Sequence, residues 1–280
     1  MRQDDRAPFE HALRRARESA GAYVGQESFM AADEIRGLAA QAGIGPGVSV
    51  LDVCCGTAGP GTVITRELGC SYLGVDASAG AIALARSRAG ELPCRFEVRP
   101  VPPLPGGTFD VVLLLETMLA FQDKDALVRA VAGALRPGGR FAFTLEEGPP
   151  LTAAERAAMP DADTVWLTPL DELEASLSRA GLAVAWVEDT SRAHRAQAAA
   201  LADAFAGDGA AIAAVVGERA LDELLAAHRL WVRWLDSGRM RKLAVVAAPA
   251  NGGWVGERSL RGAAKSGTRR PRESTVVFQQ

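Results

Sequence analysis

Short apolar runs alternate with longer amphipathic segments along most of the chain. The runs are rich in Val and Leu and are too short for helices, whereas the segments between them carry apolar residues at helical spacing. We predict strands at residues 48–53, 72–76, 95–98, 109–115, 140–145, 183–188 and 242–247. Helices are expected at residues 10–42, 62–68, 79–89, 124–135 and 170–180. This alternation predicts a doubly wound α/β fold, a parallel sheet with helices on both faces.

The pattern changes between the last two predicted strands, where residues 192–206 and 210–235 are both helical in character. Ligands of such sheets bind beyond the carboxyl ends of the strands, so we expect a helical lid at about 191–237. Residues 1–46 are predicted to be helices that close over the ligand, and residues 47–250 to form the main domain. Residues 251–280 turn to Gly, Ser and Arg, a composition typical of a disordered tail.

Composition and charge narrow the partners and the compartment. The 280 residues include 31 basic and 34 acidic ones, a net charge of −3, which disfavours affinity for nucleic-acid phosphates. No apolar run reaches the length of a membrane span, and the first residues lack the apolar core of a secretory signal. Four cysteines without a CxxC pair indicate free thiols in a reducing cytoplasm, and three scattered histidines predict no metal site.

The strongest chemical signal is a buried strand that ends in Asp52 and continues into a loop of small residues up to Gly61. A helix begins at Pro60, a residue suited to the first turn. Small residues let a ligand approach the backbone, and a dinucleotide-binding loop uses the same physics. Asp52 discriminates between ligands, because its carboxylate repels a pyrophosphate but suits an ammonium group.

Two more acids follow later strands. Asp76 ends the second predicted strand, where a carboxylate can accept hydrogen bonds from both hydroxyls of a ribose. Asp76 is also a candidate N-cap for the helix that follows, and both roles are compatible. Glu116 ends the fourth strand. The predicted site therefore collects three carboxylates at one edge of the sheet.

The order of these features, followed by Phe109-Asp110 and the segment Leu135-Arg-Pro-Gly-Gly-Arg140, resembles the class I S-adenosylmethionine-dependent methyltransferases. The resemblance runs from about Gly47 to Gly148. It is closest to the small-molecule group that includes sarcosine/dimethylglycine, tocopherol and geranyl-diphosphate methyltransferases, in which a helical lid precedes the last strand. It implies a Rossmann-like fold, S-adenosylmethionine as cofactor, and in-line methyl transfer to a small molecule such as a secondary metabolite.

The resemblance also implies cofactor contacts. They fall on Tyr23, Asp52, Cys54, Gly56, Thr57, Asp76, Ala77, Val98 and Glu116. Tyr23 would close over the cofactor, Asp76 would hold the ribose, and Val98 falls at the adenine position. The chain departs from the family pattern at Cys54 and Ala58, where glycines are usual, which implies a slightly altered loop. It also carries Ala120 where the group has a histidine, so that candidate base is missing.

Two histidines remain as candidate catalytic residues, each with a structural alternative. His228 lies on the apolar face of the predicted lid helix. It could act as a general base or be a packed core residue. His194 is flanked by an arginine and lies near a helix start. It could contact an anionic substrate or be a solvated residue. The acidic pair Glu146-Glu147 closes the fifth strand, either attracting a cationic amine or lying in a solvated loop.

Two other functions compete with methyl transfer to a small molecule. A protein of the same fold can bind the cofactor and catalyse a non-methylating reaction such as cyclisation. An RNA methyltransferase would need a basic face, and only the region around residues 269–272 is locally basic.

Overall fold

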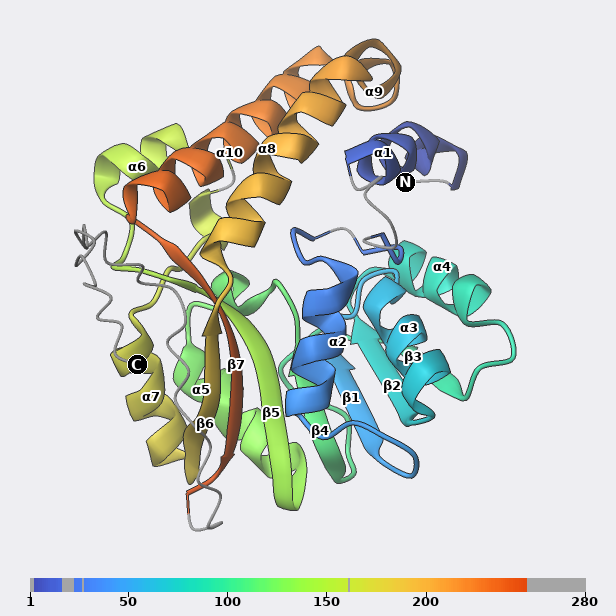
Figure 1. Cartoon of the computed structure of the whole chain (residues 1–280), viewed down its shortest axis with the longest axis vertical. Coiled ribbons are helices and arrows are strands. Elements are labelled where there is room, and N and C mark those ends of the chain that lie inside the picture. Colours follow the sequence, from blue (N-terminus) through green and yellow to red (C-terminus); the bar gives the residue numbers. More distant parts are fainter. Residues whose placement is uncertain (1–2, 17–22, 27, 161, 251–280) are drawn as a thin grey trace, which may run out of the picture.

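The computed structural model describes residues 3–16, 23–26, 28–160 and 162–250, and these form one mixed sheet with helices on both faces (Figure 1). The strand order is β3-β2-β1-β4-β5-β7-β6. The strands are β1 (Ser49–Val53), β2 (Ser71–Asp76), β3 (Cys94–Val98), β4 (Phe109–Leu114), β5 (Leu135–Glu147), β6 (Leu182–Asp189) and β7 (Arg241–Pro249). The helices are α1 (Gln3–Ala16), α2 (Ala32–Gln41), α3 (Gly59–Leu68), α4 (Ala79–Ala89), α5 (Lys124–Ala134), α6 (Ala153–Ala158), α7 (Leu170–Arg179), α8 (Ser191–Gly207), α9 (Gly209–Val216) and α10 (Glu218–Ser237), with short 3₁₀ turns η1 (Met118–Ala120) and η2 (Ala162–Thr164). The predicted doubly wound α/β class is confirmed.

One strand differs from the predicted parallel arrangement. β7 runs antiparallel to both of its neighbours, β5 and β6. Helices α8, α9 and α10, here called the insertion, lie beyond the carboxyl ends of the strands (Figure 1). The chain leaves α10 at that edge and enters β7 from it, so the first residues of β7 lie beside the last residues of β5. This reversal places Lys242 opposite Glu146.

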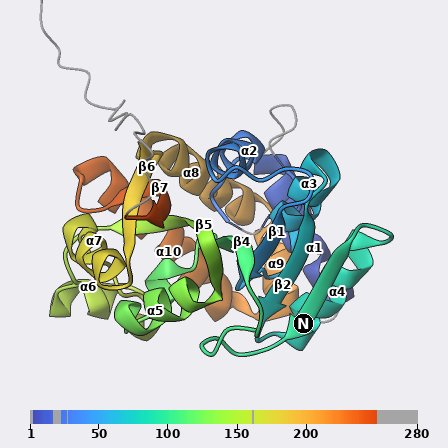
Figure 2. The ribbon, with the colours of Figure 1, turned by 90° about the horizontal axis from the view of Figure 1, so that it is seen from below.

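Alternate residues of the central strands face two separate apolar layers. On one face, α2, α3 and α4 pack against Val50, Tyr72 and Val111. On the other, α5 and α7 pack against Leu51 and Val112. The view along the sheet shows both layers of helices (Figure 2). This two-sided burial explains why the strand sequences are almost continuously apolar.

Several helices differ from the sequence prediction. The region expected as residues 10–42 forms two helices, α1 and α2, and α6 was not predicted. The helix expected at 210–235 is divided into α9 and α10 at Gly217, whose φ of +88° interrupts the helix. The predicted tail at 251–280 lies outside the described residues.

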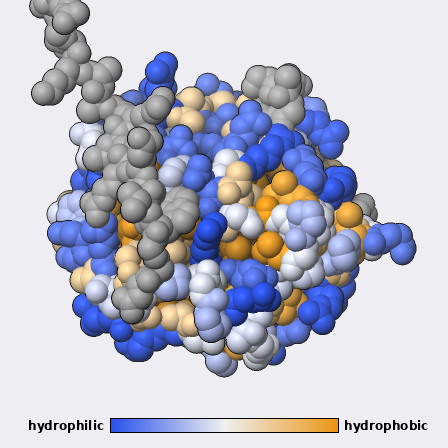
Figure 3. All heavy atoms as spheres, turned by 60° about the horizontal axis from the view of Figure 1, so that its bottom comes forward, coloured by the Kyte–Doolittle hydropathy of each residue, from blue (hydrophilic) through white to orange (hydrophobic). Residues whose placement is uncertain are grey.

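Helix α1 packs on the insertion rather than on the sheet. Phe9 contacts Phe205 of α8 edge-to-face, and Arg15 forms an ion pair of 2.5 Å with Asp208. Within the described residues, no single helix is long and apolar enough to cross a membrane; only α8 and α9 together reach that length, and they meet at an 80° bend. The face in Figure 3 mixes hydrophilic residues with smaller hydrophobic groups.

Candidate functional site

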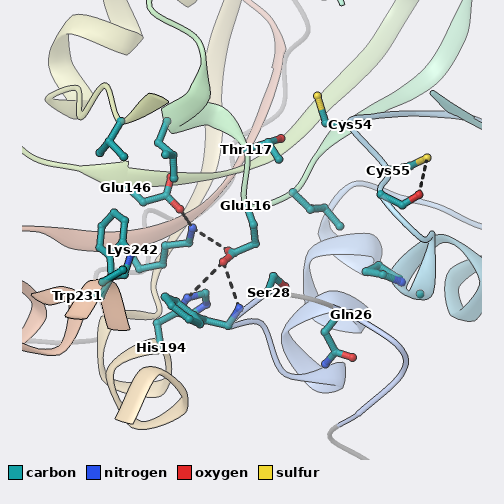
Figure 4. A pocket seen from close by; sticks show the side chains of 18 of the residues that line it. Gln26, Ser28, Cys54, Cys55, Glu116, Thr117, Glu146, His194, Trp231 and Lys242 are labelled. Atoms are coloured by element: carbon teal, nitrogen blue, oxygen red, sulfur yellow. Dashed lines mark hydrogen bonds and ion pairs between the residues drawn. The ribbon is translucent and has the colours of Figure 1, made fainter. Parts of the chain in front are cut away.

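A pocket of about 530 Å³ lies along the carboxyl edge of the sheet, from β2 across β1, β4 and β5 to β7. One end is lined by the loop after β1, by the tip of β2 and by residues 25–29. The other is lined by residues after β4 and by side chains of the insertion and β7. Glu116 lies between the two ends (Figure 4). We call them the loop end and the insertion end.

The loop end is shaped by unusual backbone conformations. Cys54 and Ala58 have φ values of 60° and 54°, in the left-handed region that glycine adopts most readily. The loop therefore reaches its conformation with side chains at the two positions where the family pattern has glycines. Glu116 has a φ of 61°, and all three of these non-glycine residues line the pocket. Strained backbone of this kind is concentrated at functional sites.

A close backbone approach joins the loop to the N-terminal segment. A Cβ on Gly59 would lie 2.3 Å from the carbonyl carbon of Gly25, so only glycine fits there. Arg88 of α4 fastens the same contact: its Nη1 donates to the Gly25 carbonyl at 2.9 Å and to Thr57 Oγ1 at 2.6 Å. Its Nη2 forms an ion pair of 2.9 Å with Glu10 of α1. The segment before α2 thus closes one side of the loop end.

Asp52 is buried at the base of the loop end and accepts a hydrogen bond of 2.5 Å from the Tyr72 hydroxyl. Burial, and to a lesser extent the charge of Asp76, raises the pKa of Asp52 to about 7, while the Tyr72 hydrogen bond acts in the opposite direction. A cationic group bound nearby would favour the ionised carboxylate.

Asp76 lies at the tip of β2 and is half-buried. Its Oδ2 accepts from the Gly56 amide at 3.0 Å and its Oδ1 from the Ser78 amide at 2.8 Å. The alternative role as an N-cap is wrong, because Ser78 caps α4 by accepting from the Ala81 amide. Asp76 therefore orders the loop while its carboxylate lines the pocket.

The insertion end combines an apolar wall with a charged floor. The wall contains Leu119, Met159, Val165, Ala227, Trp231, Leu235 and Met240. The floor contains Glu116, Glu146, His194 and Lys242, which we call the charge cluster (Figure 4). Lys242 Nζ lies 2.8 Å from Glu116 Oε1 and also contacts Glu146 Oε1. Burial alone raises the pKa of Glu116, but Lys242 and His194 together lower it below its ordinary value.

The two histidines both line this end, in different surroundings. His194 is buried between carboxylates: Nε2 lies 3.4 Å from Glu34 and Nδ1 lies 3.9 Å from Glu116. Its predicted alternative as a solvated residue is wrong. His228 is half-buried, and its Nδ1 lies 2.8 Å from the Leu224 carbonyl. Since a carbonyl only accepts, Nδ1 carries the proton and Nε2 of the neutral ring keeps its lone pair.

Three predicted cofactor contacts do not line the pocket. Tyr23 packs in the apolar cluster of α1 and the insertion. Ala77 is exposed beside Asp76, and Val98 is 49% exposed at the end of β3. The other predicted residues line the pocket together: Asp52, Cys54, Gly56, Thr57, Asp76, Glu116, His194 and His228. Their roles toward a ligand remain predictions.

Sequence reasoning missed Lys242 and misread Glu146. The solvated-loop alternative for the acidic pair is wrong, because Glu146 is 5% exposed and bound to Lys242, and Glu147 pairs with Arg241. One signal was available: Lys242 opens the predicted strand at 242–247, which is otherwise apolar, in a chain with few lysines. A lysine in that place requires a buried partner.

Comparison with known proteins finds a methyltransferase domain and methyltransferase relatives. A model described as a methyltransferase domain matches residues 50–139. The chain is similar to 27-O-demethylrifamycin SV methyltransferase of Amycolatopsis mediterranei, with 33% identity over 58% of this chain and 63% of that protein. It is also similar to phosphoethanolamine N-methyltransferase 3 of Arabidopsis thaliana, with 37% identity over 35% of this chain and 21% of that protein. The chain thus spans less than two thirds of the length of these relatives.

Solved structures agree on the fold. The cyclopropane synthase MmaA2 from Mycobacterium tuberculosis superposes with a TM-score of 0.74 at 14% identity, covering 88% of this chain and 94% of that one.

The residues of the loop end suit S-adenosylmethionine, which bears an ammonium group, a sulfonium and a ribose. Asp52 and Asp76 offer carboxylates to the ammonium group and to the ribose hydroxyls, and small residues leave the backbone accessible. The motif order, the matched methyltransferase domain and the relatives support a class I S-adenosylmethionine-dependent methyltransferase of the small-molecule type, with S-adenosylmethionine as cofactor.

Proposed function

We propose that the chain methylates a hydroxyl oxygen of a small molecule bound at the insertion end. The observation that carries this proposal is a single pocket that joins the loop end to an apolar wall and a neutral histidine. When bound, S-adenosylmethionine would supply an activated methyl group, which passes to the acceptor oxygen as the S–CH3 bond breaks and S-adenosylhomocysteine leaves. The similarity to a methyltransferase named for 27-O-demethylrifamycin SV supports an oxygen acceptor.

The apolar wall would hold the body of the acceptor. Trp231 and Leu235 of α10 line one side, and Met159 and Val165 lie in the segment around α6 and η2. Apolar contacts of this kind orient an acceptor without reacting with it. Correct orientation alone contributes on the order of 7–11 kcal/mol in well-aligned reactions. The insertion would thus act as the lid expected from the sequence.

His228 is the residue best placed to accept the proton of the hydroxyl. Its Nδ1–H donates to the Leu224 carbonyl, which leaves Nε2 as an acceptor. Burial lowers the pKa of His228 below 6.5, so the ring is neutral near neutral pH. Edge-to-face contacts with Phe29 and Phe205 hold the ring in place. A neutral, oriented imidazole matches the requirements of a general base.

His194 suits a positioning role better. Its ring nitrogens face the carboxylates of Glu34 and Glu116, which can only accept hydrogen bonds when ionised. Both nitrogens lie within ion-pair range of these carboxylates, at 3.4 and 3.9 Å, without a hydrogen bond among the described residues. His194 would help to keep Glu116 in place between the two ends of the pocket.

The test is a turnover assay. The full chain is incubated with S-adenosylmethionine and a panel of hydroxylated, amine-bearing and prenyl acceptors, and S-adenosylhomocysteine and methylated products are measured by mass spectrometry. We expect product from hydroxylated acceptors that carry a sizeable apolar body. If calorimetry shows that the cofactor binds but no acceptor in the panel yields S-adenosylhomocysteine, the proposal fails and a non-methylating reaction becomes the better interpretation.

A further inference from the structure

The side chains that line the pocket carry more negative than positive charge, and this excess affects which acceptors can bind at the insertion end. Four carboxylates line the whole pocket, from Asp52, Asp76, Glu116 and Glu146, against a single lysine, Lys242. Within the described part of the chain, no arginine lines it. Anionic groups such as phosphates are usually bound by arginine, by lysine or by helix N-termini. The N-terminus of α3 lines the loop end, so it is the insertion end that is poor in the groups that anions require.

The single lysine of the pocket already forms ion pairs with two carboxylates. Lys242 is 2% exposed, and its ammonium contacts Glu116 on one side and Glu146 on the other. Burial alone lowers the pKa of Lys242, but the two carboxylates raise it above its ordinary value. Its positive charge is thus matched by two negative charges. Little of it remains to attract an anion.

One carboxylate oxygen of Glu146 can still accept a hydrogen bond. Its Oε1 contacts Lys242, while its Oε2 is buried without a hydrogen-bond partner among the described residues. A buried carboxylate oxygen in this state is costly, and a ligand that donates a hydrogen bond would relieve that cost. A ligand that brings another negative charge would increase it.

One more cation lies near the charge cluster. Lys124 of α5 is close enough for the charge of Glu146 to act on it. Its ammonium, however, donates to the carbonyl oxygens of Phe121 and Trp166 at 2.7 and 2.8 Å, and Lys124 does not line the pocket. Lys124 thus holds the segment that leads to the apolar wall through these hydrogen bonds, and its ammonium does not reach a ligand in the pocket.

We infer that the charge cluster selects uncharged, apolar alcohols and excludes phosphorylated acceptors, with the buried carboxylate of Glu146 opposing a bound phosphate. This inference rests on the proposed function. It separates this chain from the plant enzyme whose name specifies phosphoethanolamine, although the two are 37% identical over 103 residues. That similarity covers 35% of this chain, so most of the chain lies outside it.

The experiment uses alcohols paired with phosphates of the same apolar body: benzyl alcohol and benzyl phosphate, octanol and octyl phosphate, geraniol and geranyl diphosphate. Binding to the full chain loaded with S-adenosylhomocysteine is measured by calorimetry. We expect at least one alcohol to bind, and its phosphorylated partner to bind about tenfold more weakly or worse.

A matched pair of variants assigns the selection to Glu146. In Glu146→Gln one negative charge is removed and Lys242 loses a partner, so we expect the preference for alcohol over phosphate to fall about tenfold. Glu147→Gln makes the same chemical change one residue away, in a side chain that pairs with Arg241 and does not line the pocket. It should leave the preference unchanged. The comparison of alcohol with phosphate is made on the unmodified chain, so it remains a valid test even if Glu146→Gln does not fold.

The outcomes separate this inference from the proposed function. If phosphates bind as tightly as their alcohols, or if none of the three alcohols binds, the charge selection is wrong. Equal preferences in Glu146→Gln and the unmodified chain would also overturn it. Release of S-adenosylhomocysteine in the turnover assay decides the proposed function independently, since any hydroxylated acceptor that turns over supports it, whatever its charge.

Discussion

The two ends of the pocket are built in different ways. The loop end comes mainly from one continuous segment, residues 52–60, with Asp76 about twenty residues later. The insertion end draws its charged floor from β5, α8 and β7 and from the residue after β4, and these are separated by up to 126 positions between Glu116 and Lys242. One end is a local strand–loop–helix unit, whereas the other exists only after the sheet has closed.

This difference teaches which parts of the site are generic. The loop end relies on backbone conformation and two carboxylates, features that suit one cofactor in many proteins. The insertion end relies on side chains held by long-range packing, so we expect substitutions there to change the acceptor without disturbing the cofactor. The two ends should therefore respond independently to mutation, and the following predictions test that independence.

The largest expected effect is at the insertion end. His228→Gln should lower kcat by about 10²- to 10⁴-fold, the usual contribution of a general base, because Gln cannot take the proton. Affinity for S-adenosylhomocysteine should change little by calorimetry, since His228 lines the insertion end and its contact with the loop end is an aromatic one, to Phe29. His11→Gln is the matched control, because His11 is exposed and pairs with Asp208 away from the pocket. Parallel losses of turnover and cofactor affinity would show that the two ends are not independent.

The second prediction concerns the loop end. Asp76→Asn should weaken cofactor affinity about 10- to 100-fold, because a charged acceptor becomes a neutral one and a ribose hydroxyl loses a strong hydrogen bond. Calorimetry with S-adenosylhomocysteine measures the loss. Asp125→Asn provides a control, since Asp125 is an exposed partner of Arg179 outside this pocket. Cofactor affinity equal to that of the unmodified chain would remove Asp76 from the binding site.

The strands and the loop end could be predicted from sequence because they depend on local patterns. The strand ending in Asp52 and the helix at 79–89 are local in origin, and the structure has them where they were expected. The direction of β7 could not be predicted, because it depends on where α10 returns the chain to the sheet. The same holds for Glu146: its environment is set by Lys242, 96 positions away, and no local pattern links the two.

Tyr23 and Val98 show a second limit. Both were assigned from the order of motifs in a family rather than from chemistry of their own. Tyr23 packs with the insertion because α1 lies against α8, and Val98 sits on an edge strand where its side chain is exposed. Position in a motif fixed their place in the chain, but tertiary packing decided their surroundings.

The third prediction uses the pKa of Asp52. Because its pKa in the folded chain is raised to about 7, Asp52 contributes stability that is fully present below its unfolded pKa and is lost as the pH rises through about 7. Asp52→Asn keeps the shape but cannot ionise. Relative to the unmodified chain, its free energy of unfolding should therefore rise by about 2–3 kcal/mol between about pH 5 and pH 8. The unpaired hydrogen of the Asn amide lowers its stability equally at both pH values and does not change this difference.

Urea denaturation of the cofactor-free chain at the two pH values measures this difference. Asp110→Asn is a control, because Asp110 lies at the opposite edge of the sheet and pairs with Arg136. A stability difference between Asp52→Asn and the unmodified chain that stays constant with pH would mean that Asp52 is ionised throughout. Cofactor affinity of Asp52→Asn should also fall most at high pH, where the unmodified carboxylate is charged.

The smallest effect comes from exchanging residue types within the loop. Ala58→Gly relieves a left-handed alanine, a gain of about 1 kcal/mol, but it adds backbone entropy to the unfolded chain, so the net change in stability should stay within about 1 kcal/mol. Gly56→Ala is the reciprocal change at φ +54°, where an added Cβ meets no heavy atom within 4 Å. It should destabilise by about 1 kcal/mol through backbone strain alone.

Urea denaturation of both variants, with calorimetry for the cofactor, completes the test of a loop end made by backbone conformation. If backbone shape is what the cofactor requires, Ala58→Gly should bind it as the unmodified chain does, because glycine reaches the same conformation. A loss of more than tenfold would show that the buried methyl group of Ala58 supports the cofactor site directly. The loop end would then depend on side chains as the insertion end does, and the contrast between the two would be one of sequence distance alone.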